Sequence, residues 1–279
     1  MRIRLLTQDD KAQALALWKV SFDYDPPAFA DWYFENRYLP QWSVGVFDGD
    51  KLISMIHGTP MTLSLGEGSF PALMTSGVAT VSEEQGKGHM HEAMLFLRAC
   101  AAEKGIRALF NHPQRQGAYA HLGFRSCAFT QYWRGEGTHR AGDIAPFSEE
   151  EAFRIYTALS DRYAGFVRRD RDGFRLKMAD YASVGGRGFL VKEAGRTVGY
   201  CMYFDGEDLW AEEVLSLAGY GSILHELQRL AAGRAVCAKL PPDADGEGET
   251  LPQNVMLAPE DIWQAMERAG RPWFCVDEY

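Results

Sequence analysis

The sequence lacks the features that mark membrane, secreted and zinc-binding proteins. No apolar run approaches the roughly 18 to 20 residues of a membrane-spanning helix, and the apolar start passes at once into polar Gln8-Asp9-Asp10, which does not fit a signal peptide. The five cysteines are scattered, odd in number and without a close CxxC pair. Neither a disulfide framework nor a metal site is therefore predicted, and we expect a cytoplasmic protein without a bound metal.

Positive charge is also scarce, since 29 Lys and Arg stand against 38 Asp and Glu, a formal net charge of −9. Proteins that bind nucleic acids concentrate basic residues on one surface, so we expect no nucleic-acid partner. The acidic balance suits a cationic substrate, although many acidic proteins are merely soluble. With 279 residues, 46% of them hydrophobic, the chain is globular and long enough for two domains.

The pattern of apolar residues indicates two halves of similar design. In the first, strand-like runs at 43–47, 52–58, 61–65 and 72–81 precede an amphipathic helix and a buried strand at 106–110. A polar, Gly-rich linker is predicted at 138–148. Beyond the linker, a shorter version of the same pattern contains a hairpin at 188–204, a strand at 211–217, helices at 149–159, 222–230 and 259–269, and a strand at 236–240. We predict domains at 1–140 and 148–279.

The most informative segment runs from Ser76 to Met90, where a strand enters a loop containing Gly86 and Gly88 and a long helix follows. The first amides of a helix lack internal partners and carry partial positive charge, and glycines let the backbone approach a phosphate closely. Lys87 adds a mobile positive charge. The Gly-Lys-Gly triplet alone is as consistent with a plain connecting turn, and it fits neither a P-loop nor a dinucleotide fingerprint.

A second signature follows this loop: the run Ala108-Leu109-Phe110-Asn111 and the turn Tyr119-Ala120-His121-Leu122-Gly123-Phe124. Together the two segments resemble the GNAT superfamily of acyl-CoA-dependent N-acyltransferases. Gly77-Val78-Ala79-Thr80, the degenerate second half and the C-terminal Phe-Cys-Val-Asp-Glu-Tyr resemble its Eis-type branch. The family's loop usually begins with Gln or Arg where this sequence has Glu83.

The resemblance implies an α/β (α+β) chain of two GNAT-like domains, each a mostly antiparallel mixed sheet flanked by helices, the second degenerate and without cofactor. It implies transfer of an acetyl group from acetyl-CoA to a primary amine of a small molecule or peptide. Tyr119 would be the general acid, and the terminal carboxylate of Tyr279 would return to the active site. The residues implied in binding acetyl-CoA are Val78, Ala79, Thr80, Gly86, Lys87, Gly88, His89, Met90 and Asn111.

Several alternatives stay open at this point. Tyr119 is also consistent with a tyrosine that merely packs on its own turn. The chain as a whole is also consistent with a CoA-binding sensor or scaffold that no longer catalyses a reaction. No residue stands out as an acyl-carrying nucleophile, which favours direct attack, and Cys127 reads as a small buried residue. The aromatic residues of the N-terminal helices suit a pocket wall and a core equally. The acceptor, the acyl chain length and self-association as a homo-oligomer are not specified by the sequence.

Overall fold

The computed structural model describes residues 1–279 except 67, 116, 136–140, 246–247 and 277–279. Its first strands are β1 (Arg2–Leu5), β2 (Val44–Asp48), β3 (Lys51–Leu65), β4 (Ser69–Thr80), β5 (Ala108–Asn111) and β6 (Arg125–Trp133). The later strands are β7 (Asp143–Pro146), β8 (Ala164–Val167), β9 (Arg187–Glu193), β10 (Arg196–Asp205), β11 (Leu209–Ser216), β12 (Val236–Leu240) and β13 (Glu249–Leu257).

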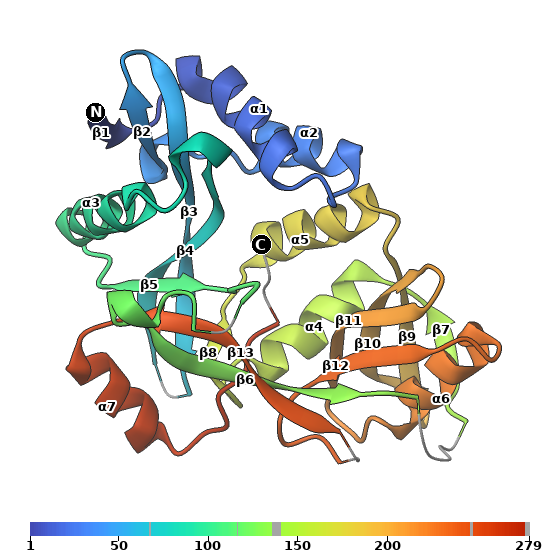
Figure 1. The fold of residues 1–279 in the computed structure, drawn as a ribbon. Coiled ribbons are helices and arrows are strands. Elements are labelled where there is room, and N and C mark those ends of the chain that lie inside the picture. Colours follow the sequence, from blue (N-terminus) through green and yellow to red (C-terminus); the bar gives the residue numbers. More distant parts are fainter. Residues whose placement is uncertain (67, 116, 136–140, 246–247, 277–279) are drawn as a thin grey trace.

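The α-helices flank these strands (Figure 1). They are α1 (Lys11–Ser21), α2 (Pro27–Asn36), α3 (His89–Glu103), α4 (Glu149–Leu159), α5 (Arg171–Ser183), α6 (Gly221–Ala231) and α7 (Glu260–Ala269). Short 3-10 turns precede α1, β2 and α3, and another, η4 (Ala120–Leu122), precedes β6.

All thirteen described strands belong to one sheet, in the order β1-β2-β3-β4-β5-β13-β6-β12-β11-β10-β9-β7, with β8 paired to β3. Only β4 with β5 and β11 with β12 pair in parallel among the described strands, and each of these pairs is joined by a helix, α3 or α6. The predicted fold class, a mostly antiparallel mixed sheet flanked by helices, is confirmed.

The first half follows the sequence pattern closely. The apolar positions of α3 fall at helical spacing, and Ala93, Met94 and Leu97 pack into a core with β2, β3 and β5. The helix ends just before Gly105, whose φ of +80° is disfavoured for other residues. The runs predicted at 52–58 and 61–65 form one strand, β3, because the pairing with β4 continues through both.

Four elements of the second half were not predicted from the sequence. β7 lies inside the predicted linker and pairs with β9. β8 and α5 occupy a stretch dense in Arg and Asp, which has too few apolar residues to show a helical or strand periodicity. β13 contains Pro252, and a proline argues against a central strand. The sheet tolerates this proline because the register with β6 shifts between Pro252 and Asn254.

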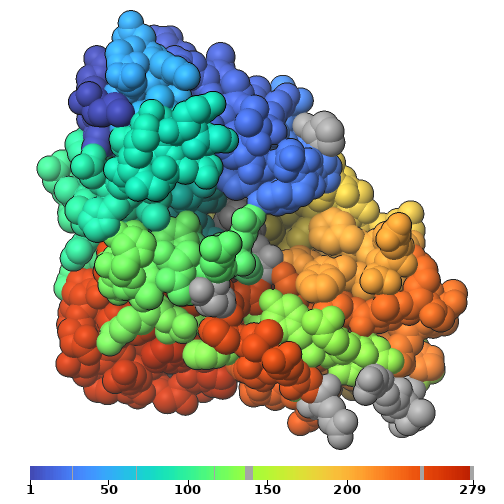
Figure 2. Space-filling model, in the orientation of Figure 1, coloured from blue at the N-terminus to red at the C-terminus, as the bar shows by residue number. Residues whose placement is uncertain are grey.

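The two halves share the sheet. β13 lies between β5 and β6, so a strand from the predicted second domain completes the sheet of the first. The predicted division into 1–140 and 148–279 stays a prediction. In the space-filling view, the blue N-terminal part of the chain borders the yellow and orange second half on this face (Figure 2). The site described next lies where they meet.

Candidate active site

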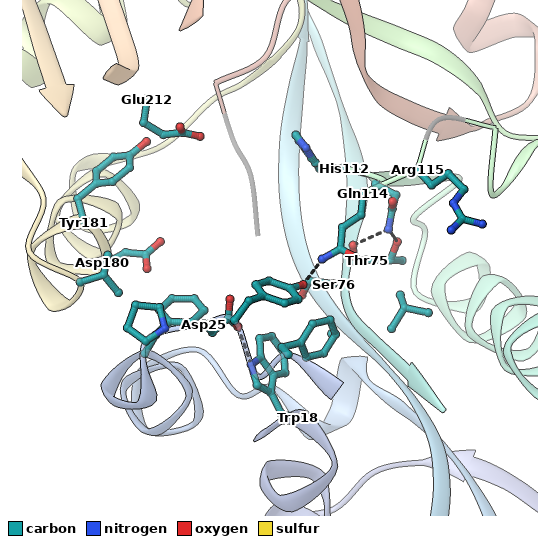
Figure 3. Close-up of a pocket in the computed structure, with 18 of the residues that line it drawn as sticks. Trp18, Asp25, Thr75, Ser76, His112, Gln114, Arg115, Asp180, Tyr181 and Glu212 are labelled. Carbon is teal, nitrogen blue, oxygen red and sulfur yellow. Dashed lines mark hydrogen bonds between the residues drawn. The ribbon is translucent and has the colours of Figure 1, made fainter. Parts of the chain in front are cut away.

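A cavity of about 810 Å³ lies beside the point where β4 and β5 separate. Three parts of the chain form it, and Figure 3 shows Asp180, Tyr181 and Glu212 across from His112 and Gln114. The N-terminal segment contributes Trp18, Phe22, Tyr24, Asp25, Pro26 and Phe29. The strands β4 and β5 and the residues after β5 contribute Thr75, Ser76, Gly77, Val78, Asn111, His112, Gln114, Arg115, Ala118 and Tyr119. The second half contributes Lys177, Asp180, Tyr181, Val184, Phe204 and Glu212.

A β-bulge in β4 forms one wall of this cavity. His57 pairs with Ser76 and Met55 with Ala79, so Gly77 and Val78 together oppose one residue of β3. Gly77 has a φ of +53°, and a Cβ placed on it would lie 2.3 Å from the ring of Trp18. Only glycine fits here. A bulge leaves a peptide group outside the ladder, and both bulge residues line the cavity.

Asn111 ends β5 at the last pair with β4, opposite Thr75. Its Nδ2 donates to the backbone oxygen and to Oγ1 of Thr75, at 2.9 Å each. These bonds fix the side chain, and among the described residues its buried Oδ1 has no hydrogen-bond partner. A buried amide oxygen without a partner is rare in folded proteins. Asn111 therefore offers an acceptor to a ligand in the cavity.

Tyr119 lies at the start of η4 and lines the same cavity. The backbone N–H of Leu122 donates to its carbonyl oxygen at 3.0 Å, and Gly123 closes the turn with a φ of +88°. Burial raises the pKa of Tyr119 above its usual value, and the nearby Asn111 side chain acts in the opposite direction. The phenol therefore stays protonated across the neutral range, as a proton donor must.

The predicted phosphate loop follows the C-terminal end of β4 and does not line the cavity. Gly86 and Gly88 have φ values of +76° and +88°, and a Cβ on either would meet no atom within 4 Å. Gly88 is the N-cap of α3 and provides no side-chain cap. The first amides of α3 therefore border open space, without a capping side chain.

The other predicted cofactor residues are spread along this path. Val78 and Asn111 line the cavity, whereas Ala79 is buried and Thr80 bonds through its hydroxyl to Ser54 at 2.8 Å. Lys87, His89 and Met90 lie at the start of α3, outside the cavity lining. Tyr279 lies outside the described residues. The structure thus brings together Tyr119, Asn111 and Val78 in one cavity, and the glycine loop follows the C-terminal end of the same strand.

Three carboxylates line the cavity and differ in their partners. Asp180 lies 3.0 Å from Lys177 Nζ and 3.5 Å from the Arg37 guanidinium, which reaches it from α2. Glu212 lies 2.5 Å from Lys239 Nζ. Asp25 accepts a bond from Trp18 Nε1 at 3.1 Å and has no ion-pair partner among the described residues. Burial raises the pKa of Asp25. Of the three carboxylates, Asp25 is the one whose charge is not neutralised by a basic side chain of the described residues, so a cationic ligand could pair with it.

The aromatic residues of the first two helices divide between wall and core. Trp18, Phe22 and Phe29 line the cavity, whereas Tyr33 and Phe34 are buried beneath it around His57. Sequence reasoning missed the α5 side of the cavity and Glu212. The only signal for α5 was apolar spacing at Phe174, Met178 and Tyr181, which the surrounding charges mask.

The described residues contain no group of three or more His, Cys, Asp or Glu arranged to hold a metal ion. Cys127 is fully buried and burial raises its pKa well above the usual value, which fits a packing residue and not a nucleophile. Within the same described part of the chain, no helix has the length and apolar character needed to cross a membrane.

Comparisons with known proteins agree with this geometry. Residues 2–127 match the family model described as acetyltransferase (GNAT) domain. Among solved structures, the fold is similar to a probable N-acyltransferase of Enterococcus faecalis V583, with 16% identity and a TM-score of 0.75 over 92% of this chain and 72% of that one. Eis1 of Mycobacterium abscessus gives 14% identity and a TM-score of 0.68 over 92% and 74%.

The N-myristoyltransferase of Saccharomyces cerevisiae, solved with bound myristoyl-CoA, is similar as well. It gives 8% identity and a TM-score of 0.62 over 92% of this chain and 82% of that one. A search of curated proteins gives no match. Residues 2–127 thus match an acetyltransferase (GNAT) domain, and the described part of the chain has the mixed α/β fold of the GNAT N-acetyltransferases.

Proposed function

We propose that this protein transfers an acetyl group from acetyl-CoA to a primary amine by direct attack, with Tyr119 as the general acid. The observation that carries the proposal is one cavity holding the β4 bulge, Asn111, a protonated Tyr119 and the unneutralised Asp25. The GNAT family match supports an acyl-CoA substrate. The proposal also specifies that the transferred group is acetyl and that the protein is related to the Eis-type branch.

At the cofactor end, the residues fit a diphosphate. We assign its contacts to the backbone of Gly86, Lys87, Gly88, His89 and Met90, because the start of α3 is open and uncapped by any side chain. The strand Val78-Ala79-Thr80 leads from this loop to the cavity, so it would run beside the pantetheine arm. Asn111 Oδ1, without a partner among the described residues, would accept from an amide of that arm.

At the reacting end, a peptide N–H of the bulge would donate to the thioester oxygen and polarise the carbonyl. The neutral amine attacks the carbonyl carbon, the carbon–sulfur bond breaks, and Tyr119 gives its proton to the departing thiolate. The new amide nitrogen releases its extra proton to water, and the phenolate takes one back. Positioning both reactants in one cavity supplies much of the acceleration.

At the amine end, Asp25 would hold the substrate as an ammonium ion before it loses its proton. Trp18, Phe22 and Phe29 surround this carboxylate, and cations bind favourably over aromatic rings. Asp25→Asn should raise KM for the amine about tenfold and leave CoA affinity unchanged, since one buried charge contact is lost. Asp23→Asn is the matched control, because Asp23 lies two residues away and does not line the cavity.

The test is release of free thiol from acetyl-CoA with a panel of primary amines. Tyr119→Phe should lower kcat about a hundredfold while CoA binding is kept, because only the proton donor is removed. Tyr24→Phe makes the same chemical change in the same cavity and should leave kcat unchanged. If CoA binds but no amine is acetylated and Tyr119→Phe changes nothing, the chain is a CoA-binding sensor and the proposal is wrong.

The role of the terminal carboxylate of Tyr279, a cytoplasmic location and self-association stay predictions. Adding one alanine after Tyr279 moves that carboxylate without removing a side chain. Loss of activity in the extended protein, with normal CoA affinity, is the result expected if the carboxylate takes part.

A further inference from the structure

Glu84 holds the two basic side chains at the start of α3. Its Oε1 lies 2.9 Å from Lys87 Nζ and its Oε2 lies 3.0 Å from His89 Nε2. Glu84 belongs to the 3-10 turn Ser82–Glu84 that follows β4, so the carboxylate reaches forward across both glycines of the loop. Lys87 and His89 together hold the pKa of Glu84 below its usual value, and the carboxylate is charged at neutral pH.

This carboxylate lies where the backbone favours negative charge. The start of a helix carries partial positive charge, and α3 has no side-chain cap at Gly88. Open space surrounds Gly86 and Gly88, so the loop has room for an anion larger than a carboxylate. In the protein without cofactor, Glu84 thus supplies the negative charge that the loop and its two basic residues attract.

We propose that Glu84 is a built-in competitor for the cofactor diphosphate, which must draw Lys87 and His89 away from it. The inference rests on the proposed function, because it takes the start of α3 as the diphosphate site. A diphosphate that reaches these residues meets one carboxylate already paired with both of them. Glu84 therefore weakens CoA binding and stabilises the loop when the site is empty.

Glu83 provides a matched comparison within the same turn. It carries the same charge one residue earlier and is exposed, and it has no hydrogen bond or ion pair among the described residues. Replacing either glutamate by glutamine removes one negative charge near the diphosphate. Only the Glu84 change also releases Lys87 and His89, so the difference between the two variants isolates the contact.

The expected effects on binding and on stability have opposite signs. Glu84→Gln should bind CoA about three- to tenfold more tightly than the parent, the range expected for the loss of one surface ion pair with Lys87 and one hydrogen bond with the buried His89. Its melting temperature without ligand should stay level or fall slightly, because the same two contacts are lost. The gain should shrink at high salt, since exposed charges are screened. Glu83→Gln should gain less than twofold.

The experiment is calorimetric titration of CoA into the parent, Glu84→Gln and Glu83→Gln proteins, repeated with S-acetylpantetheine, which lacks the diphosphate. Tighter CoA binding by Glu84→Gln alone, with unchanged binding of S-acetylpantetheine, is the predicted result. Equal gains in both variants, or weaker CoA binding by Glu84→Gln, overturn the competition while leaving the proposed function standing if the parent still acetylates amines. Absence of CoA binding by all three proteins overturns both.

Discussion

Two strand–helix–strand units, one in each half of the chain, have the same connectivity but differ in what surrounds them: one lies beside a cavity and the other is packed with side chains. β4-α3-β5 pairs its strands in parallel over Ala72–Thr75, and β11-α6-β12 does so over Leu209–Ala211. In the first unit the strands then separate beside a cavity, and the helix starts at an uncapped glycine. In the second, the helix starts at Tyr220, which is buried in the core.

Glu213 of β11 also forms a buried ion pair, with Arg169 just before α5. Arg169 makes three hydrogen bonds of 3.0 Å to Glu213 of β11, and the hydroxyl groups of Tyr181 and Tyr200 donate to the same carboxylate. Neither Arg169 nor Glu213 reaches solvent appreciably, at 3% and 0% side-chain exposure. The two units thus share a backbone arrangement, of which one lies beside the candidate site and the other is packed into the core.

The largest expected effect comes from breaking this buried pair. Arg169→Ala leaves Glu213 as a buried charge with only tyrosine donors, and the free energy of unfolding should fall by about 3 to 5 kcal/mol. Urea unfolding followed by circular dichroism measures this loss. Arg187→Ala, which removes the exposed pair between Arg187 and Asp205, should cost about 1 kcal/mol or less. Equal losses in the two variants would mean that the pair does not hold the second unit together.

The first half should be the more acid-sensitive because of His57. Burial lowers the pKa of His57 to about 3, and neither ring nitrogen has a hydrogen-bond partner among the described residues. The unfolded chain takes up a proton near pH 6.5 and the folded protein does not, so stability is full above that pH and falls as the pH decreases. Between pH 7 and pH 4.5 this one group should cost about 2.5 kcal/mol.

His57→Phe replaces the ring with one that cannot be protonated, so its stability should fall correspondingly less over that pH range. Denaturant unfolding at pH 7 and pH 4.5 gives the change in the free energy of unfolding for the parent and for the variant. His112, whose pKa burial lowers to about 4, titrates in both proteins and cancels in the comparison. If parent and variant lose the same stability, His57 is not kept neutral in the fold.

A smaller effect compares the helix starts of the two units directly. Gly88→Ala forces alanine to a φ of +88° and should lower stability by about 1 to 2 kcal/mol and weaken CoA binding. Gly221→Ala lies at the start of α6, where the glycine has an ordinary φ, and should be neutral or stabilise by up to about 1 kcal/mol. Thermal unfolding and CoA titration of both variants make the comparison. Similar CoA affinities in the two would show that the first loop does not bind the cofactor.

The sequence predicted the parts of the site that local chemistry determines. The glycines of the α3 loop, the Tyr119 turn and the helical face of α3 each have a signature within a few residues. The fold class was implied by the family resemblance that these segments carry. The family resemblance implied that Asn111 binds the CoA arm, and the structure shows Asn111 lining the same cavity as Tyr119, with its side chain fixed by the bonds to Thr75.

The sequence could not predict contacts between distant segments. Asp180 and Tyr181 reach the cavity only because α5 packs against α2, and no local pattern specifies that contact. The placement of β13 between β5 and β6 is also a long-range pairing, and Pro252 argued against a strand there. Asp25 lines the cavity and accepts a hydrogen bond from Trp18, a contact that no local pattern of the sequence specifies.

The most direct measurement is a crystal structure of the protein with CoA. We expect diphosphate oxygens within hydrogen-bond distance of the backbone nitrogens of residues 86–90, with the pantetheine arm beside Val78-Ala79-Thr80 and the sulfur atom next to the hydroxyl group of Tyr119. A diphosphate bound elsewhere on the protein, or a sulfur atom far from Tyr119, would contradict it.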